Sequence, residues 1–129
     1  MGTWDVQPWD NDDAADWFSE FFEGIDFDSR IESAFEHEDS YDQVRAACYI
    51  LQVLGRVYVW PGDIDKLGSH LDRGIRHLKT MVDVDHEACQ ELQEMWGADS
   101  GIFASIKAQL AELEIRRSEG NWKPSDKAD

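Results

Sequence analysis

Two pairs of carboxylates in the first third of this chain are spaced as metal ligands would be. Glu20 and Glu23 are one helical turn apart, and so are Glu36 and Asp39. Hard cations prefer carboxylate oxygens, so four such side chains on neighbouring helices could gather Mg²⁺ around a nucleotide triphosphate. One hypothesis is therefore a metal site formed by Glu20, Glu23, Glu36 and Asp39.

This layout resembles that of the all-α nucleotide pyrophosphohydrolases, which implies a Mg-dependent enzyme. The resemblance departs from the family at Ser19, where a further acid is expected. Glu20 and Glu23 also lie off the apolar face predicted for their helix, where solvated charges normally occur. The motif is short for a chain with 28 acidic residues. The enzyme is therefore the alternative hypothesis, and we favour a protein without catalytic activity.

Two further patterns could bind metal, but neither is complete. Asp12, Asp13 and Asp16 match the D-D-x-x-D pattern that holds magnesium in prenyl-diphosphate enzymes, yet no second metal motif follows. Acids in the first turn of a helix are favoured by its dipole without any ligand. His86 and Cys89 could be zinc ligands one turn apart, but a closed site needs four. The sequence therefore predicts no metal and no cofactor.

Acidic and aromatic residues are concentrated together at the start of the chain. Residues 1–43 contain fourteen Asp and Glu against one basic residue, whereas residues 44–129 contain fourteen against eleven. Carboxylates beside a tryptophan suit a partner's Arg or Lys, through charge and cation–π contact. We expect a basic protein partner to bind here, with Trp9 as the buried anchor and the acids steering association. The predicted binding residues are Trp9, Asp10, Asp12, Asp13, Asp16 and Glu20.

A non-enzymatic interaction protein is therefore the first hypothesis. Small, very acidic bacterial proteins include inhibitors, among them immunity proteins that neutralise basic nuclease toxins, although this is an analogy of composition. The acidic segment could equally be an ordinary solvated face or an adaptation to a salt-loving host. The oligomeric state also stays open.

The overall charge and hydropathy exclude other classes of partner. A net charge of −16 argues against binding nucleic acid or an anionic membrane. No apolar run approaches the roughly 20 residues of a membrane span, and the start lacks the pattern of a signal peptide. Cys48 and Cys89 each fall on the apolar stripe of a predicted helix. Buried, reduced thiols are typical of a cytoplasmic protein.

The spacing of apolar residues is close to 3.6 almost throughout, which predicts helices and no strands. Short connections between them favour an all-α, single-domain antiparallel bundle of about six helices over residues 1–129, with 118–129 a loose polar tail. The expected helices run from Asp10 or Asn11 to Gly24, Ser29 to His37, Ser40 to Val59, Ile64 to Val82, Asp83 or Asp85 to Trp96, and Asp99 or Ser100 to Arg117.

The apolar faces predict which side chains are buried. The helix from Ser40 opens with a capping box that ends at Gln43. It is apolar almost all round, so we expect it to be the central helix, with Gly55 allowing a neighbour to pack closely. Trp96 is also expected in the core. The first helix is expected to bury Ala14, Trp17, Phe18, Phe21 and Ile25.

A basic stripe runs along the fourth predicted helix. Lys66, His70, Arg73 and His77 share one face. We expect a solvated face, or one that pairs with the chain's own acidic helices. The alternative is an anion-binding or self-association site.

The opening residues resemble the signature of a family of small bacterial proteins with a domain of unknown function, M-G-x-W…P-[FW]-D-N-D-x-A-x-D-W. Here the match runs from Met1 to Trp4 and from Pro8 to Trp17, with departures at Asp5 and Gln7, where glycines are usual. The segment from Leu92 to Trp96 is also similar to the family's C-terminal half. The resemblance implies a small helical cytoplasmic protein and no particular activity.

Overall fold

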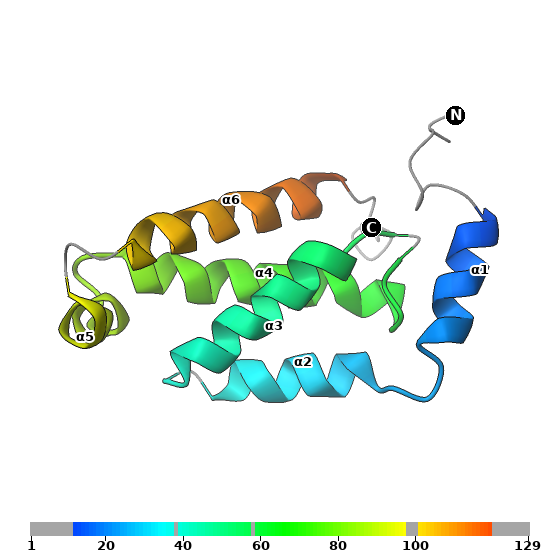
Figure 1. Cartoon of the computed structure of the whole chain (residues 1–129), viewed down its shortest axis with the longest axis horizontal. Helices are drawn as coiled ribbons and strands as arrows, with labels where there is room; N and C mark the ends of the chain where they lie inside the picture. The colour runs from blue at the N-terminus through cyan, green and yellow to red at the C-terminus, as the bar shows by residue number, and fades with distance from the viewer. Residues whose placement is uncertain (1–11, 38, 58, 98–100, 120–129) are drawn as a thin grey trace.

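The segments whose apolar residues recur at helical spacing form helices in the structure. The computed structural model describes residues 12–37, 39–57, 59–97 and 101–119, and within these ranges it contains helices and no strand (Figure 1). The all-α prediction is therefore confirmed. The helices are α1 (Asp12–Phe21), α2 (Phe27–Glu36), α3 (Tyr41–Leu54), α4 (Ile64–Val82), α5 (Glu87–Trp96) and α6 (Ile102–Glu119).

The central helix is α4, and the expectation that the preceding helix would be central is wrong. α4 packs against α2, α3, α5 and α6, and Figure 1 shows it running through the middle of the molecule. Its residues Leu67, Leu71 and Leu78 are fully buried. α3 buries one face only, since Tyr49 and Val53 are about half exposed at 57% and 47%. The helix whose sequence is apolar almost all round, α3, is therefore not the helix that contacts the largest number of neighbours.

α3 also ends earlier than its apolar pattern predicts. The helix stops at Leu54, and Gly55 is its C-cap, with its backbone N–H bonded to the carbonyl of Leu51. Gly55 therefore ends the helix, and it does not lie in the middle of a helix as the expected close packing of a neighbour requires. At the other end Ser40 precedes the helix but makes no capping hydrogen bond with its side chain, so the expected capping box is not formed.

The close approach of helices occurs instead at Gly74, in the middle of α4. A methyl group added there would lie 3.0 Å from Leu113 of α6, 3.2 Å from Cys48 of α3 and 3.4 Å from Phe35 of α2. Three helices therefore meet α4 at one residue that has no side chain. The two predicted buried thiols are confirmed, since Cys48 and Cys89 are both buried and free.

α5 begins later than predicted. Its first residue is Glu87, and His86 is the N-cap, accepting a hydrogen bond from the backbone N–H of Ala88. Trp96, expected in the core, is 49% exposed at the last position of α5. The predicted caps of the last helix lie outside the described residues. Of the tail predicted over 118–129, Ser118 and Glu119 belong to α6, and the remainder lies outside the described residues.

One finding bears on the expected absence of membrane segments. Among the helices described, none combines the length and the apolar character needed to span a bilayer.

Candidate functional site

α1 carries an apolar face that the other described residues leave uncovered. Trp17 is 56% exposed and Phe21 is 63% exposed, and their rings stack with centroids 4.8 Å apart. Ile25, just after the helix, is also exposed. The expectation that these three side chains lie in the core is therefore wrong, because α1 stands at one end of the molecule, steeply inclined to the other helices (Figure 1).

A chain of aromatic rings attaches α1 to the other helices. Phe22 contacts Phe27 edge to face, with centroids 5.2 Å apart. Phe27 contacts the buried Trp60 in the same way at 5.8 Å. Phe22 and Phe27 are only partly buried. α1 makes few other contacts with the helices, so this attachment leaves most of its surface open.

The predicted acids line the same helix. Asp13, Asp16 and Glu20 lie on α1, and their side chains are exposed. Asp12 is the first residue of α1, but the environment of its side chain is not described, and Trp9 and Asp10 lie outside the described residues. Carboxylates and an exposed aromatic pair therefore occur on one helix of ten residues. We call Asp13, Asp16, Trp17, Glu20 and Phe21 the α1 surface.

A groove of about 430 Å³ adjoins the α1 surface and involves α3. Phe18 of α1 lines it together with Tyr49 and Val53, two exposed large apolar residues of α3. The other residues lining the groove are Gln52, Leu54, Arg56, Val59 and Arg116. The apolar area open to a partner is therefore wider than one helix, and the part contributed by α3 was not predicted from the sequence.

The four carboxylates of the enzyme hypothesis are not brought together. Glu20 and Glu23 lie at the end of α1, before α2 begins, whereas Glu36 and Asp39 lie at the far end of α2. A helix of ten residues is about 15 Å long, which separates the two pairs. Within the described residues no three His, Cys, Asp or Glu side chains are grouped so that they could hold a metal ion. The geometry therefore does not support the predicted metal cluster.

The two possible zinc ligands have other roles. The Nδ1 atom of His86 accepts the backbone N–H of Ala88 at 3.0 Å, and Cys89 is buried, with its Sγ accepting a hydrogen bond from Gln93. Both atoms therefore serve the first turns of α5.

Part of the predicted basic stripe is a buried polar network. His70 is only 1% exposed, and its Nε2 donates to the Asp28 carboxylate at 2.8 Å. Asp28 also accepts the indole N–H of Trp60 at 3.2 Å and the backbone N–H of Asp63 at 2.8 Å. The expectation of a solvated face is wrong for His70, while the pairing with an acidic helix expected for this stripe is found at Asp28 of α2.

Gly62 is required by this network, because a Cβ atom there would lie 2.5 Å from the carboxylate of Asp28. The spacing that identifies the network is present in the sequence. Asp28 continues the apolar positions of Ile31 and Phe35, and His70 lies beside Leu71 on the buried side of α4. Polar residues at core positions of a helix were therefore the signal that sequence analysis overlooked.

No protein-family model matches the chain, and neither a curated protein nor a solved structure matches it. The resemblance of the opening residues to a bacterial family stays a prediction.

Proposed function

We propose that this protein binds a basic protein partner through the α1 surface, and that it acts as an inhibitor of the immunity type rather than as an enzyme. The observation that carries the proposal is the stacked pair of Trp17 and Phe21, more than half exposed on a helix that also presents Asp13, Asp16 and Glu20 to solvent. Large apolar side chains gathered on a surface are typical of interaction sites.

Each component of the α1 surface has a distinct role in binding. The carboxylates attract a positively charged partner over long range, which accelerates association and is weakened by salt. The aromatic pair supplies apolar area and ring faces on which an arginine or lysine can lie, so it slows dissociation. Trp9 and Asp10, named from the sequence, remain among the proposed binding residues.

The groove beside α1 gives the partner an apolar contact next to the charged one. Tyr49 and Val53 of α3 lie there with Phe18. An arginine or lysine side chain has an apolar stem and a charged head, so a basic segment can cover this area while its charges meet α1. We propose the cytoplasm as the location, where Cys48 and Cys89 stay reduced.

Affinity capture with the whole chain as bait tests the proposal, with captured proteins identified by mass spectrometry. We expect a basic protein to be held at low salt, released at high salt, and lost when Asp13→Asn, Asp16→Asn and Glu20→Gln are combined. A matched control combines Asp85→Asn, Glu94→Gln and Glu114→Gln, which removes the same charge from exposed positions outside the α1 surface. Equal capture by the two variants would contradict the proposal.

The kinetics of the captured partner then separate the two roles. The α1 charge variant is expected to associate several-fold more slowly and to dissociate at nearly the normal rate. A variant with Trp17→Ala and Phe21→Ala should instead dissociate faster, at an almost unchanged association rate. Stopped-flow fluorescence measures both rates.

A further inference from the structure

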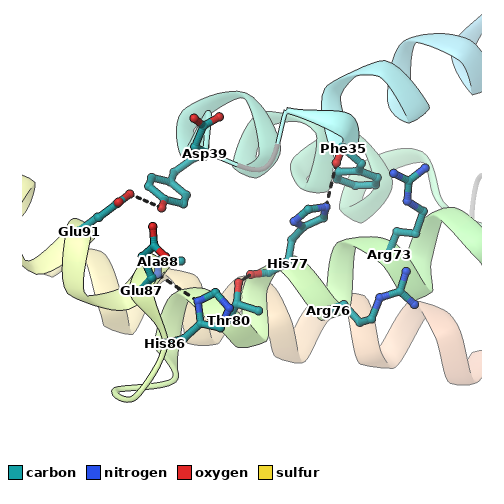
Figure 2. A pocket seen from close by; sticks show the side chains of 11 residues that line it. Phe35, Asp39, Arg73, Arg76, His77, Thr80, His86, Glu87, Ala88 and Glu91 are labelled. Atoms are coloured by element: carbon teal, nitrogen blue, oxygen red, sulfur yellow. Dashed lines mark hydrogen bonds between the residues drawn. The ribbon is translucent and has the colours of Figure 1, made fainter.

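A second hollow shares no lining residue with the groove and has one basic end and one acidic end. It is a cleft of about 520 Å³ between the end of α2, α4 and the start of α5. Figure 2 shows Arg73 and Arg76 at one end, and Asp39, Glu87 and Glu91 at the other. None of these residues belongs to the α1 surface.

The two arginines at the basic end are not paired with an acid of the described chain. Arg73 lies over the ring of Phe35, 5.7 Å from its centroid, and Arg76 is exposed one turn further along α4. Within the described residues no carboxylate forms an ion pair with either guanidinium, whereas Arg117 on the neighbouring helix pairs with Asp72 at 2.8 Å. The chain has 28 acids and only 12 bases, yet these two neighbouring arginines form no ion pair within the described residues. Their guanidinium groups are therefore available to an anionic group.

The acidic end is held in place by a hydrogen bond from the start of α3. The hydroxyl of Tyr41 donates to Glu91 at 2.5 Å, and Tyr41 is buried. Asp39 and Glu87 lie beside this pair and are exposed. Burial and the Glu91 carboxylate both raise the pKa of Tyr41, so its hydroxyl keeps its proton and continues to donate. This end therefore carries negative charge suited to a cationic group.

The residues between the two ends are fixed by local hydrogen bonds. The Nε2 of His77 donates to the carbonyl of Phe35 at 3.1 Å, because a carbonyl can only accept. Thr80 bonds the carbonyl of His77 at 2.7 Å, and His86 caps α5. The His77 bond joins α4 to α2, and the bond from Tyr41 to Glu91 joins the start of α3 to α5. Neighbouring helices are therefore linked beside the cleft, so part of its shape is set before any ligand arrives.

We propose that this cleft binds a small zwitterionic ligand, with its carboxylate or phosphate at Arg73 and Arg76 and its amine at Glu87 and Glu91. The net charge of −16 repels a simple anion from the whole molecule. A zwitterion carries no net charge and escapes this repulsion, while its two ends match the two ends of the cleft. The overall charge therefore favours a zwitterion over a plain anion.

A series of linear amino carboxylates of increasing chain length tests this assignment. Each is compared with the alkyl carboxylate and the alkyl amine of the same length, by titration followed through the backbone amide signals in nuclear magnetic resonance. We expect one chain length to bind best, with shifts confined to the segments that line the cleft, 35–41, 73–80 and 86–91. Each matched probe with a single charge should bind at least about tenfold more weakly, because charge-assisted hydrogen bonds at one end are lost.

Variants assign each end of the ligand. Arg76→Gln, at an exposed position, should abolish binding of the best amino carboxylate, whereas Lys107→Gln on α6 removes the same charge outside the cleft and should leave binding unchanged. Glu87→Gln should weaken binding of the amino carboxylate and not of the alkyl carboxylate. Circular dichroism checks that each variant is folded.

Three results would overturn the proposal. They are the absence of binding by every chain length, binding of the alkyl carboxylate as tightly as the amino carboxylate, and equal loss of binding in Arg76→Gln and Lys107→Gln. The α1 surface and the cleft share no residue, and each is tested with its own variants. Failure of the ligand titrations therefore does not bear on the proposed binding of a basic protein partner.

Discussion

Asp28 is the buried carboxylate at which α2 and the turn before α4 meet α4. It accepts hydrogen bonds from Trp60, Asp63 and His70. The Nδ1 atom of His70 is buried and has no hydrogen-bond partner among the residues described. Because Nε2 donates its proton to Asp28, a neutral imidazole has no proton on Nδ1. The Nδ1 atom is then an unpaired acceptor and not an unpaired donor. The network therefore depends on the carboxylate, which is its one shared acceptor.

Asp28→Asn is expected to destabilise the protein by about 3 kcal/mol, because an amide has one acceptor oxygen for three donors and turns an N–H toward another N–H. Urea unfolding followed by tryptophan fluorescence measures the change. Asp85→Asn, at an exposed site, serves as the control and should change stability by less than about 0.5 kcal/mol. Equal midpoints for the two variants would show that the Asp28 network adds nothing to stability.

Cys48 is expected to make the protein less stable in alkaline solution. Burial raises the pKa of its thiol from 9.0 to about 12. Between these values the unfolded chain loses the thiol proton and the folded chain keeps it, so unfolding is increasingly favoured as pH rises above 9. One such proton contributes up to about 1.4 kcal/mol per pH unit.

Unfolding free energies measured from pH 8 to pH 11 test this dependence. Cys48→Ala removes the titrating group and should give a shallower decline than the wild-type chain. Tyr41, whose pKa is also raised, remains in both and contributes to the remaining slope. Parallel declines in the two proteins would mean that Cys48 does not contribute.

At the level of elements, α1 differs from the others because it is not held by a shared core. Its ten residues are fewer than the roughly 12–15 at which an isolated helix becomes marginally stable in water. Its contact through Phe22, Phe27 and Trp60 therefore provides the stabilisation that it needs. An element attached in this way can separate from the remaining helices without unfolding them.

Phe22→Ala is expected to release α1 while the other helices stay folded. Amide hydrogen exchange in 13–21 should approach the rate of an unstructured peptide, and protection in α4 should be unchanged. Phe103→Ala, at a partly buried position of α6, is the comparison, and it should lower protection across the helices that share the core. Loss of protection in α4 after Phe22→Ala would mean that α1 is part of the cooperative core.

A comparison of α4 with α1 shows why the sequence predicted the first helix correctly and the burial of the second wrongly. Helical spacing identified α4 with its bounds, since Leu67, Leu71 and Leu78 recur on one face and turn residues precede Ile64. The same reasoning assigned Trp17 and Phe21 to the core. Periodicity shows that a helix has an apolar face, but it does not show whether another element covers that face.

Across the whole molecule, acidic side chains greatly outnumber basic ones. Arg56, Arg116 and Arg117 pair with nearby acids, yet the net charge is −16. Self-repulsion of this kind destabilises the compact state and is reduced by salt. The free energy of unfolding should therefore increase as the ionic strength rises.

Raising NaCl from about 10 mM to about 100 mM shortens the Debye length from about 30 Å to about 10 Å, and the thermal midpoint is expected to rise by roughly 2–4 °C. Differential scanning calorimetry measures the shift. The variant with Asp13→Asn, Asp16→Asn and Glu20→Gln should show a smaller rise, because it carries three fewer repelling charges. A fall in the midpoint with salt would mean that ion pairs dominate.

Fold class, the bounds of α4 and the burial of both cysteines followed from sequence, because helix propensity and apolar spacing are local properties that a single chain displays. The exposed Trp17 and Phe21, the pairing of Asp28 with His70, and the cleft between α2, α4 and α5 did not follow. Each depends on residues far apart in sequence: which face is covered, which carboxylate meets which imidazole, and which charged side chains border one cleft are set when the helices pack.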